Sequence, residues 1–227
     1  MMSINEKKEL IKPGMFGLAV AADSRRTEFD FSNEQLLHLD KKVDYLFLGD
    51  SITHLWNLNA YFGTCKFLEN RGICGDTSTY LLKRFEADCI QLQPKNAIIM
   101  IGTNDITRTE PDLWWKTPGE DVEVVFKEYQ DNILQMVDKC DQTGIEVILC
   151  SVIPSTIAPP GDRERRWEMT KRMNDFLQSL GKTYVDYHSI LTRDGRNLPE
   201  EYSLDGIHPN AKAYVLMAEK LREVVKL

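Results

Sequence analysis

Short, continuously apolar runs alternate along this chain with longer stretches of helical periodicity. The apolar runs lie at residues 45–48, 66–68, 97–101, 147–152 and 183–187. Helical patterns lie between and beside them, at residues 33–42, 77–85, 86–92, 120–143, 163–180 and 209–225. Strands that are apolar at successive positions are usually covered on both faces, as in parallel sheets. The alternation therefore predicts an α/β fold, a three-layer α/β/α sandwich around a parallel sheet of about five strands.

The chain is long enough for one large domain. Its 227 residues can bury a sizeable core, and they contain neither an internal repeat nor a low-complexity linker. Residues 1–40 are less regular than the rest. We therefore expect residues 41–227 to form the domain and residues 1–40 to be an N-terminal extension that packs on it.

The charge balance argues against a nucleic-acid partner. Asp and Glu outnumber Lys and Arg by 35 to 28, a net charge of −7, so binding to a phosphate backbone would gain nothing from counterion release. No apolar run is long enough to cross a bilayer, so a membrane partner is not expected either.

The cysteines are typical of a reducing compartment. Five of them are scattered along the chain without a C-x-x-C pair, at positions 65, 74, 89, 140 and 150. An odd number cannot pair completely within one chain, so we expect reduced cysteines in a cytoplasmic protein. Secretion is the alternative, because an apolar stretch at 15–22 follows Lys7 and Lys8, although Glu6 and Glu9 argue against it.

Small and polar residues follow the ends of the predicted strands. Gly49-Asp50-Ser51 follows the first strand, residues 72–77 follow the second, residues 102–105 follow the third, and residues 205–209 lie beyond the fifth. Open α/β sheets bind ligands at the carboxyl ends of their strands. Four such clusters at one edge of a sheet predict an active site there.

The residue types in these clusters suit acyl transfer. That reaction needs a nucleophile, a base, a group that orients the base, and donors for the oxyanion. Ser51, at a strand-to-helix turn, is the candidate nucleophile, and His208 is the candidate base. Asp205, three residues before His208, is placed to orient the imidazole. The candidate oxyanion donors are the N–H groups of Ser51 and Gly75 and the side-chain amide of Asn104.

These segments resemble the sequence blocks of the SGNH hydrolase superfamily, also called GDSL lipases/acylhydrolases. The blocks appear in family order as Gly49-Asp50-Ser51, Arg71-Gly72-Ile73-Cys74-Gly75-Asp76-Thr77, Gly102-Thr103-Asn104-Asp105 and Asp205-Gly206-Ile207-His208-Pro209. One departure is Ile52, where the family usually has leucine. The resemblance implies a flavodoxin-like fold and no metal or organic cofactor. It also implies catalysis by Ser51, Gly75, Asn104 and His208, with Asp205 completing the triad.

Several neighbouring residues have structural explanations instead. Asp50 and Asp76 precede predicted helices and are expected to cap them, and Asp105 is expected to cap a turn. Gly72 is expected to be a structural turn glycine.

Two other histidines could compete with His208. His54 lies one turn beyond Ser51, but no carboxylate is placed to orient it. His188 follows the last strand, and Asp186, two residues earlier, would lie on the opposite face of that strand. We therefore favour His208 as the base.

Loops near the predicted site indicate where a substrate would bind. Trp114 and Trp115 could form a wall for an acyl group or stack on a sugar, or equally pack their loop onto the long helix. Ile153 and Pro154, at the start of a proline-rich loop, are a second candidate wall. Because the chain has no long apolar lid segment, we expect a small-molecule ester with a short acyl group, such as acetyl on a carbohydrate. No sequence feature specifies an oligomeric state.

Three other functions stay open at this point. An acyltransferase would use the same triad with a different acceptor. A metal-dependent phosphoesterase is distantly suggested by Gly49-Asp50 and residues 102–105, but the chain has no upstream D-x-H and no histidine pair with ligand spacing. A non-catalytic binding domain could keep the same fold, although the complete set of candidate residues argues against it.

Overall fold

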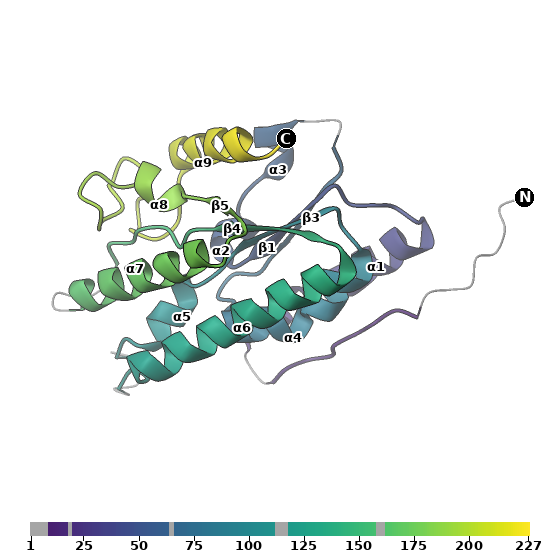
Figure 1. Cartoon of the computed structure of the whole chain (residues 1–227), viewed down its shortest axis with the longest axis horizontal. Coiled ribbons are helices and arrows are strands. Elements are labelled where there is room, and N and C mark those ends of the chain that lie inside the picture. The colour runs from purple at the N-terminus through teal and green to yellow at the C-terminus, as the bar shows by residue number, and fades with distance from the viewer. Residues whose placement is uncertain (1–8, 18–19, 64–65, 112–117, 158–161) are drawn as a thin grey trace, which may run out of the picture.

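A parallel sheet of five strands forms the centre of the protein (Figure 1). The computed structural model describes residues 9–17, 20–63, 66–111, 118–157 and 162–227. The strands are β1 (Tyr45–Gly49), β2 (Leu68–Gly72), β3 (Asn96–Met100), β4 (Glu146–Cys150) and β5 (Thr183–Val185). Their order across the sheet, β2-β1-β3-β4-β5, is the flavodoxin-like order of doubly wound sheets. The predicted fold class is confirmed.

Helices cover both faces of this sheet. One face carries α1 (Arg26–His38), α4 (Ser78–Asp88), η2 (Ile90–Leu92), α5 (Thr103–Arg108), α6 (Val122–Thr143) and α7 (Arg163–Ser179). The other face carries α2 (Ser51–His54), α3 (Leu58–Phe62), α8 (Tyr187–Ile190) and α9 (Ala211–Val224). Figure 1 shows the strands between α6 and α4 on one side and α9 and α3 on the other.

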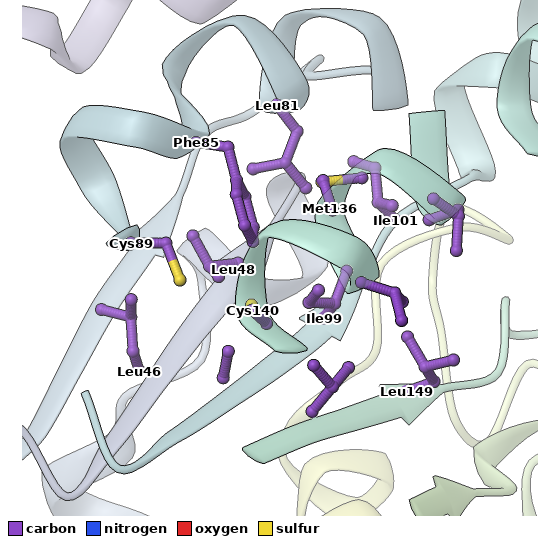
Figure 2. Close-up of a cluster of buried hydrophobic side chains, with 14 of the residues drawn as sticks. Leu46, Leu48, Leu81, Phe85, Cys89, Ile99, Ile101, Met136, Cys140 and Leu149 are labelled. Carbon is purple, nitrogen blue, oxygen red and sulfur yellow. The ribbon is translucent and has the colours of Figure 1, made fainter. Parts of the chain in front are cut away.

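The strand side chains supply both halves of the core. In β1, Leu46 and Leu48 belong to one buried apolar cluster, and Tyr45 and Phe47 belong to the other, because side chains alternate between the faces of a strand. Figure 2 shows the first cluster, in which strand residues face side chains of α4 and α6. Since both faces of β1 are covered, its sequence is apolar at successive positions.

The bounds of the second strand and of the first helix differ most from the prediction. The second strand, expected at 66–68, is β2 at Leu68–Gly72. This edge strand is mostly polar because its side chains make hydrogen bonds: Asn70 Nδ2 donates to the carbonyls of Thr53 and Trp56, at 2.7 and 3.2 Å. The first helix, expected at 33–42, is α1 at Arg26–His38, and its buried apolar positions are Phe29 and Leu36.

The segment before α1 lies along the α4 side of the molecule. The N–H of Ile11 donates to Gln91 at 3.0 Å, and the rings of Phe16 and Tyr80 lie 5.8 Å apart. The short 3-10 helix η1 (Ala21–Arg25) then leads into α1. None of the helices formed by the described residues has the length and apolar character of a membrane span.

Candidate active site

Three strand ends lie in one row at the edge of the sheet. The strand register pairs Gly49 of β1 with Gly72 of β2 and with Met100 of β3. Ser51 lies two residues beyond Gly49, and Asn104 lies four residues beyond Met100. The register therefore brings the segments after β1, β2 and β3 together at the switch point of the sheet, where doubly wound folds bind their ligands.

Ser51 is the first residue of α2 and follows β1 after a single intervening residue, Asp50. The Asp50 carboxylate accepts the N–H of Ile52 at 2.9 Å, so the predicted helix cap is confirmed. The last position of the strand before this turn has no room for a side chain, since a Cβ on Gly49 would lie 2.2 Å from the Met100 carbonyl oxygen. Tight packing on one side and the cap on the other thus fix the main chain that presents Ser51.

The side chains of Asp205, His208 and Ser51 form a hydrogen-bonded chain. Asp205 Oδ2 lies 2.6 Å from His208 Nδ1, and His208 Nε2 lies 2.9 Å from Ser51 Oγ. An ionised carboxylate can only accept, so the imidazole proton sits on Nδ1 and Nε2 presents a lone pair to the serine hydroxyl. This arrangement allows His208 to take the proton of Ser51.

Asp205 also organises the loop that carries the histidine. Its Oδ1 accepts hydrogen bonds from the Ser203 hydroxyl at 3.0 Å, the N–H of Ile207 at 2.9 Å and the N–H of His208 at 2.8 Å. Burial raises the pKa of Asp205, but hydrogen bonds from His208 and its neighbours outweigh burial and hold that pKa well below its usual range. The carboxylate therefore stays ionised at neutral pH and keeps the imidazole oriented.

Gly75 is the third residue of a tight turn after β2, which we call the oxyanion turn (residues 73–76). The N–H of Asp76 closes the turn on the Ile73 carbonyl at 3.1 Å, and the φ of Gly75 is +78°, a value that favours glycine at this position of a type II turn. Asn104 Nδ2 donates to the Asp76 carbonyl at 2.8 Å, which leaves its second amide hydrogen for a ligand. Among the described residues, no acceptor is hydrogen-bonded to the N–H of Gly75 or of Ser51.

Buried carboxyl groups lie near these donors. The pKa of Asp50 is raised to about 7, chiefly by burial and also by the charges of Asp76 and Asp105, although the hydrogen bond from Ile52 lowers it. Burial likewise raises the pKa of Asp105 to about 6, although hydrogen bonds from Ser78 lower it. Several acids in a dry environment at one edge of a sheet are typical of a functional site.

The cap of α4 differs from the prediction. Asp76 does not cap this helix; its carboxylate pairs instead with the buried guanidinium of Arg84 at 2.8 Å. The capping carboxylate comes from a different element, because Asp105 of α5 accepts the N–H of Ser78 at 3.0 Å and its hydroxyl at 2.6 Å. The cap thus ties the Asn104 segment to the start of α4.

The competing histidines lie outside the hydrogen-bonded chain. The main-chain N–H of His188 donates to Ser151 Oγ at 2.8 Å. His54 Nδ1 lies 3.1 Å from the sulfur of Cys74. Burial lowers the pKa of both imidazoles. The geometry thus agrees with the choice of His208.

The role of the four residues expected to line a substrate-binding site stays a prediction. Trp114 and Trp115 lie outside the described residues. Ile153 and Pro154 are buried, and Ile153 belongs to the apolar cluster on the α9 face. In the part of the chain that the structure describes, no three His, Cys, Asp or Glu side chains are grouped so that they could hold a metal ion.

Two residues that support the site do not stand out in the sequence. Ser203 contacts Asp205 and also accepts the N–H of Gly206 at 3.0 Å; a serine shortly before an Asp-Gly pair is a weak turn signal. Arg84 is fully buried although it is charged. Its position between Leu81 and Phe85, both in the core, is the available signal, because residues three and four apart share one face of a helix.

The chain is similar to known proteins in sequence and in fold. The model of the GDSL-like lipase/acylhydrolase family matches residues 47–216. An acetylxylan esterase of Xylanibacter ruminicola is 23% identical in an alignment of 188 residues, which covers 74% of this chain and only 38% of that longer protein.

Solved structures show the same fold. A GDSL-like lipase from Bacteroides thetaiotaomicron is 24% identical with a TM-score of 0.69, covering 88% of this chain and 96% of that one. An acetylxylan esterase from Geobacillus stearothermophilus is 21% identical with a TM-score of 0.60, covering 79% of this chain and 93% of that one.

Proposed function

This chain belongs to the GDSL-like lipase/acylhydrolase family, and we propose that it hydrolyses carboxylic esters through an acyl-enzyme on Ser51. The observation that carries the proposal is the hydrogen-bonded chain from Asp205 through both nitrogens of His208 to Ser51 Oγ, with steps of 2.6 and 2.9 Å. In serine-dependent acyl transfer by a catalytic triad, a base reaches the nucleophile in this way and a third group orients the base.

In the first half-reaction, Ser51 Oγ attacks the ester carbonyl while His208 Nε2 takes the hydroxyl proton. The carbonyl oxygen becomes an oxyanion, which accepts hydrogen bonds from the N–H groups of Ser51 and Gly75 and from the Asn104 amide. The Asp205 carboxylate stabilises the imidazolium that forms. His208 then gives its proton to the leaving alcohol as the tetrahedral intermediate collapses to the acyl-enzyme.

The second half-reaction repeats these steps with water as the nucleophile. His208 takes a proton from the water molecule that attacks the acyl carbon, and the same donors stabilise the second oxyanion. Collapse of this intermediate returns the proton from His208 to Ser51 Oγ and releases the carboxylic acid. Every proton transfer in this cycle uses Nε2 of His208, so Nδ1 stays paired with Asp205 throughout.

The test is a Ser51→Ala variant with Ser179→Ala as its matched control, since Ser179 is an exposed serine at the end of α7. We expect Ser51→Ala to keep the wild-type melting temperature and to lose at least about 10³-fold in kcat on nitrophenyl acetate. A fluorophosphonate should label the wild type and Ser179→Ala, but not Ser51→Ala. A folded Ser51→Ala protein with normal turnover would refute the proposal.

For the substrate, we propose a short acyl group, acetyl, carried by a carbohydrate. The lack of a long apolar lid segment in the sequence supports it, as does similarity to two proteins named acetylxylan esterases. A series of nitrophenyl esters from acetyl to palmitoyl should give the highest kcat/KM at the short end. Acetylated xylo-oligosaccharides should then release acetate. An optimum at long chains would contradict the proposal, and transfer of the acyl group to an added alcohol would favour an acyltransferase.

A further inference from the structure

A buried ion pair lies beneath the oxyanion turn. Arg84 of α4 and Asp76 are both fully buried, and Arg84 Nε donates to Asp76 Oδ2 at 2.9 Å. Neither side chain has a role in the acyl-transfer steps. A buried ion pair is weak evidence of added stability, because removing two charges from water costs about as much as their attraction returns. Its position therefore suggests another role.

The same guanidinium also holds the ends of two strands. Arg84 Nη2 donates to the carbonyl of Arg71 at 2.8 Å and to the carbonyl of Gly49 at 3.3 Å. Gly49 ends β1, two residues before Ser51, and Arg71 is the penultimate residue of β2. One side chain thus ties together the segment that presents the nucleophile, the strand that leads into the oxyanion turn, and the turn itself.

The main chain of Asp76 connects the two oxyanion donors that come from outside α2. Its N–H closes the turn on the Ile73 carbonyl and so holds the turn in which the Gly75 N–H lies. Its carbonyl accepts Asn104 Nδ2 at 2.8 Å and so sets the direction of the amide. A displacement of Asp76 would therefore turn both donors away from the oxyanion together.

We propose that the Arg84–Asp76 ion pair is a positioning element of the oxyanion hole. Arg84 anchors the Asp76 side chain from the core, and the anchored residue holds the Gly75 N–H and the Asn104 amide at the place where the oxyanion forms. The proposal rests on the proposed ester hydrolysis. It makes Arg84 and Asp76 positioning residues, since neither touches the reacting atoms. Oxyanion donors act only when they are held in place before the reaction, so looser donors lower kcat more than they weaken substrate binding.

Asp88 provides a matched control within the same network. It is also fully buried and accepts Arg84 Nη1 at 3.0 Å, one helical turn along α4. Its remaining partners are Arg26 and Asn33 of α1. Neutralising Asp88 therefore removes a buried charge from the same guanidinium while the contacts of the oxyanion turn stay in place.

The experiment compares Asp76→Asn with Asp88→Asn, both assayed well below their melting temperatures. Each variant is expected to lower the melting temperature, because each leaves Arg84 with one carboxylate. Asp76→Asn is expected to lower kcat by about 10- to 100-fold, with KM changed by less than about threefold. Asp88→Asn is expected to keep kcat within about threefold of the wild type. Hydrogen–deuterium exchange over residues 73–77 should be faster in Asp76→Asn and unchanged in Asp88→Asn.

Two results would overturn the proposal: wild-type kcat in Asp76→Asn, or equal kcat losses in the two variants. If Asp76→Asn fails to fold, Arg84→Lys replaces it. A lysine keeps the charge but cannot reach the carboxylate and both carbonyls at once, so kcat should fall, and an unchanged kcat would again overturn the proposal. If hydrogen–deuterium exchange at residues 73–77 is unchanged in whichever of these two variants folds, the ion pair does not position the oxyanion turn. This result holds whether or not the protein hydrolyses esters. A folded wild type that neither hydrolyses esters nor reacts with fluorophosphonate would contradict the proposed function alone.

Discussion

Replacing Asp205 with asparagine tests the triad most sharply, because the structure predicts a large loss of catalysis and only a small loss of stability. Asp205 Oδ1 holds the loop through Ser203, Ile207 and the His208 N–H, whereas Oδ2 alone faces His208 Nδ1. An asparagine that keeps its oxygen on the loop side must turn its NH₂ group towards the imidazole. Nδ1 then has to accept, the proton moves to Nε2, and the base no longer has a lone pair for Ser51.

The size of the effect follows from this geometry. A base held in the wrong tautomer lowers kcat by about 10⁴-fold in serine proteases, which corresponds to roughly 5 kcal/mol of activation free energy. Three of the four hydrogen bonds to Asp205 survive unchanged, and the fourth is reversed and loses its charge, so the free energy of unfolding should fall by only about 1 kcal/mol. For a chain of this length, that loss shifts the melting temperature by about 2–4 °C.

The assay is steady-state hydrolysis of nitrophenyl acetate beside thermal unfolding, with Asp205→Ala as the comparison. Alanine removes all four hydrogen bonds, so Asp205→Ala is expected to lose both kcat and up to about 3 kcal/mol of stability. If Asp205→Asn kept kcat within about tenfold of the wild type, the tautomer argument would be refuted. If Asp205→Asn were as unstable as Asp205→Ala, the assignment of separate roles to Oδ1, which holds the loop, and Oδ2, which orients His208, would be wrong.

Two further predictions concern stability. A Cβ on Gly72 would lie 2.2 Å from the main-chain nitrogen of His54, so Gly72→Ala should lower the free energy of unfolding by about 3 kcal/mol or more. The Cβ of Gly144→Ala would meet open space at a φ of +73°, so this variant should lose only about 1 kcal/mol. Equal losses of stability in chemical denaturation would disprove the packing argument. Burial raises the pKa of Asp50 to about 7 in the folded protein, above the ordinary value of 3.8. The protonated form of Asp50 therefore stabilises the fold at a pH below 3.8, and this stabilisation is lost as the pH rises through about 7. Asp50→Asn keeps a capping side chain but cannot ionise. Between pH 5 and pH 8, its melting temperature should therefore rise relative to that of the wild type. Parallel curves of melting temperature against pH for the two proteins would show that Asp50 is not the titrating group.

The sequence by itself determined the class of fold and the identity of the main candidate residues. Continuously apolar runs such as β1 identify a sheet covered on both faces, because each run must satisfy two apolar layers at once. Ser51, Gly75, Asn104 and His208 stand out because each follows, or lies beyond, a strand end where such folds bind ligands. These are local features of composition and order, so they can be read without coordinates.

Only the tertiary structure decided which groups meet and what supports them. The polar edge strand β2 has no apolar pattern to fix its bounds, and its place follows from pairing with β1. The cap of α4 comes from Asp105 on another element, and Asp76 pairs with Arg84 in the core. His208 reaches Ser51 across 157 positions of the chain. Such long-range hydrogen bonds and ion pairs depend on how elements pack in space, and local propensity carries no information about them.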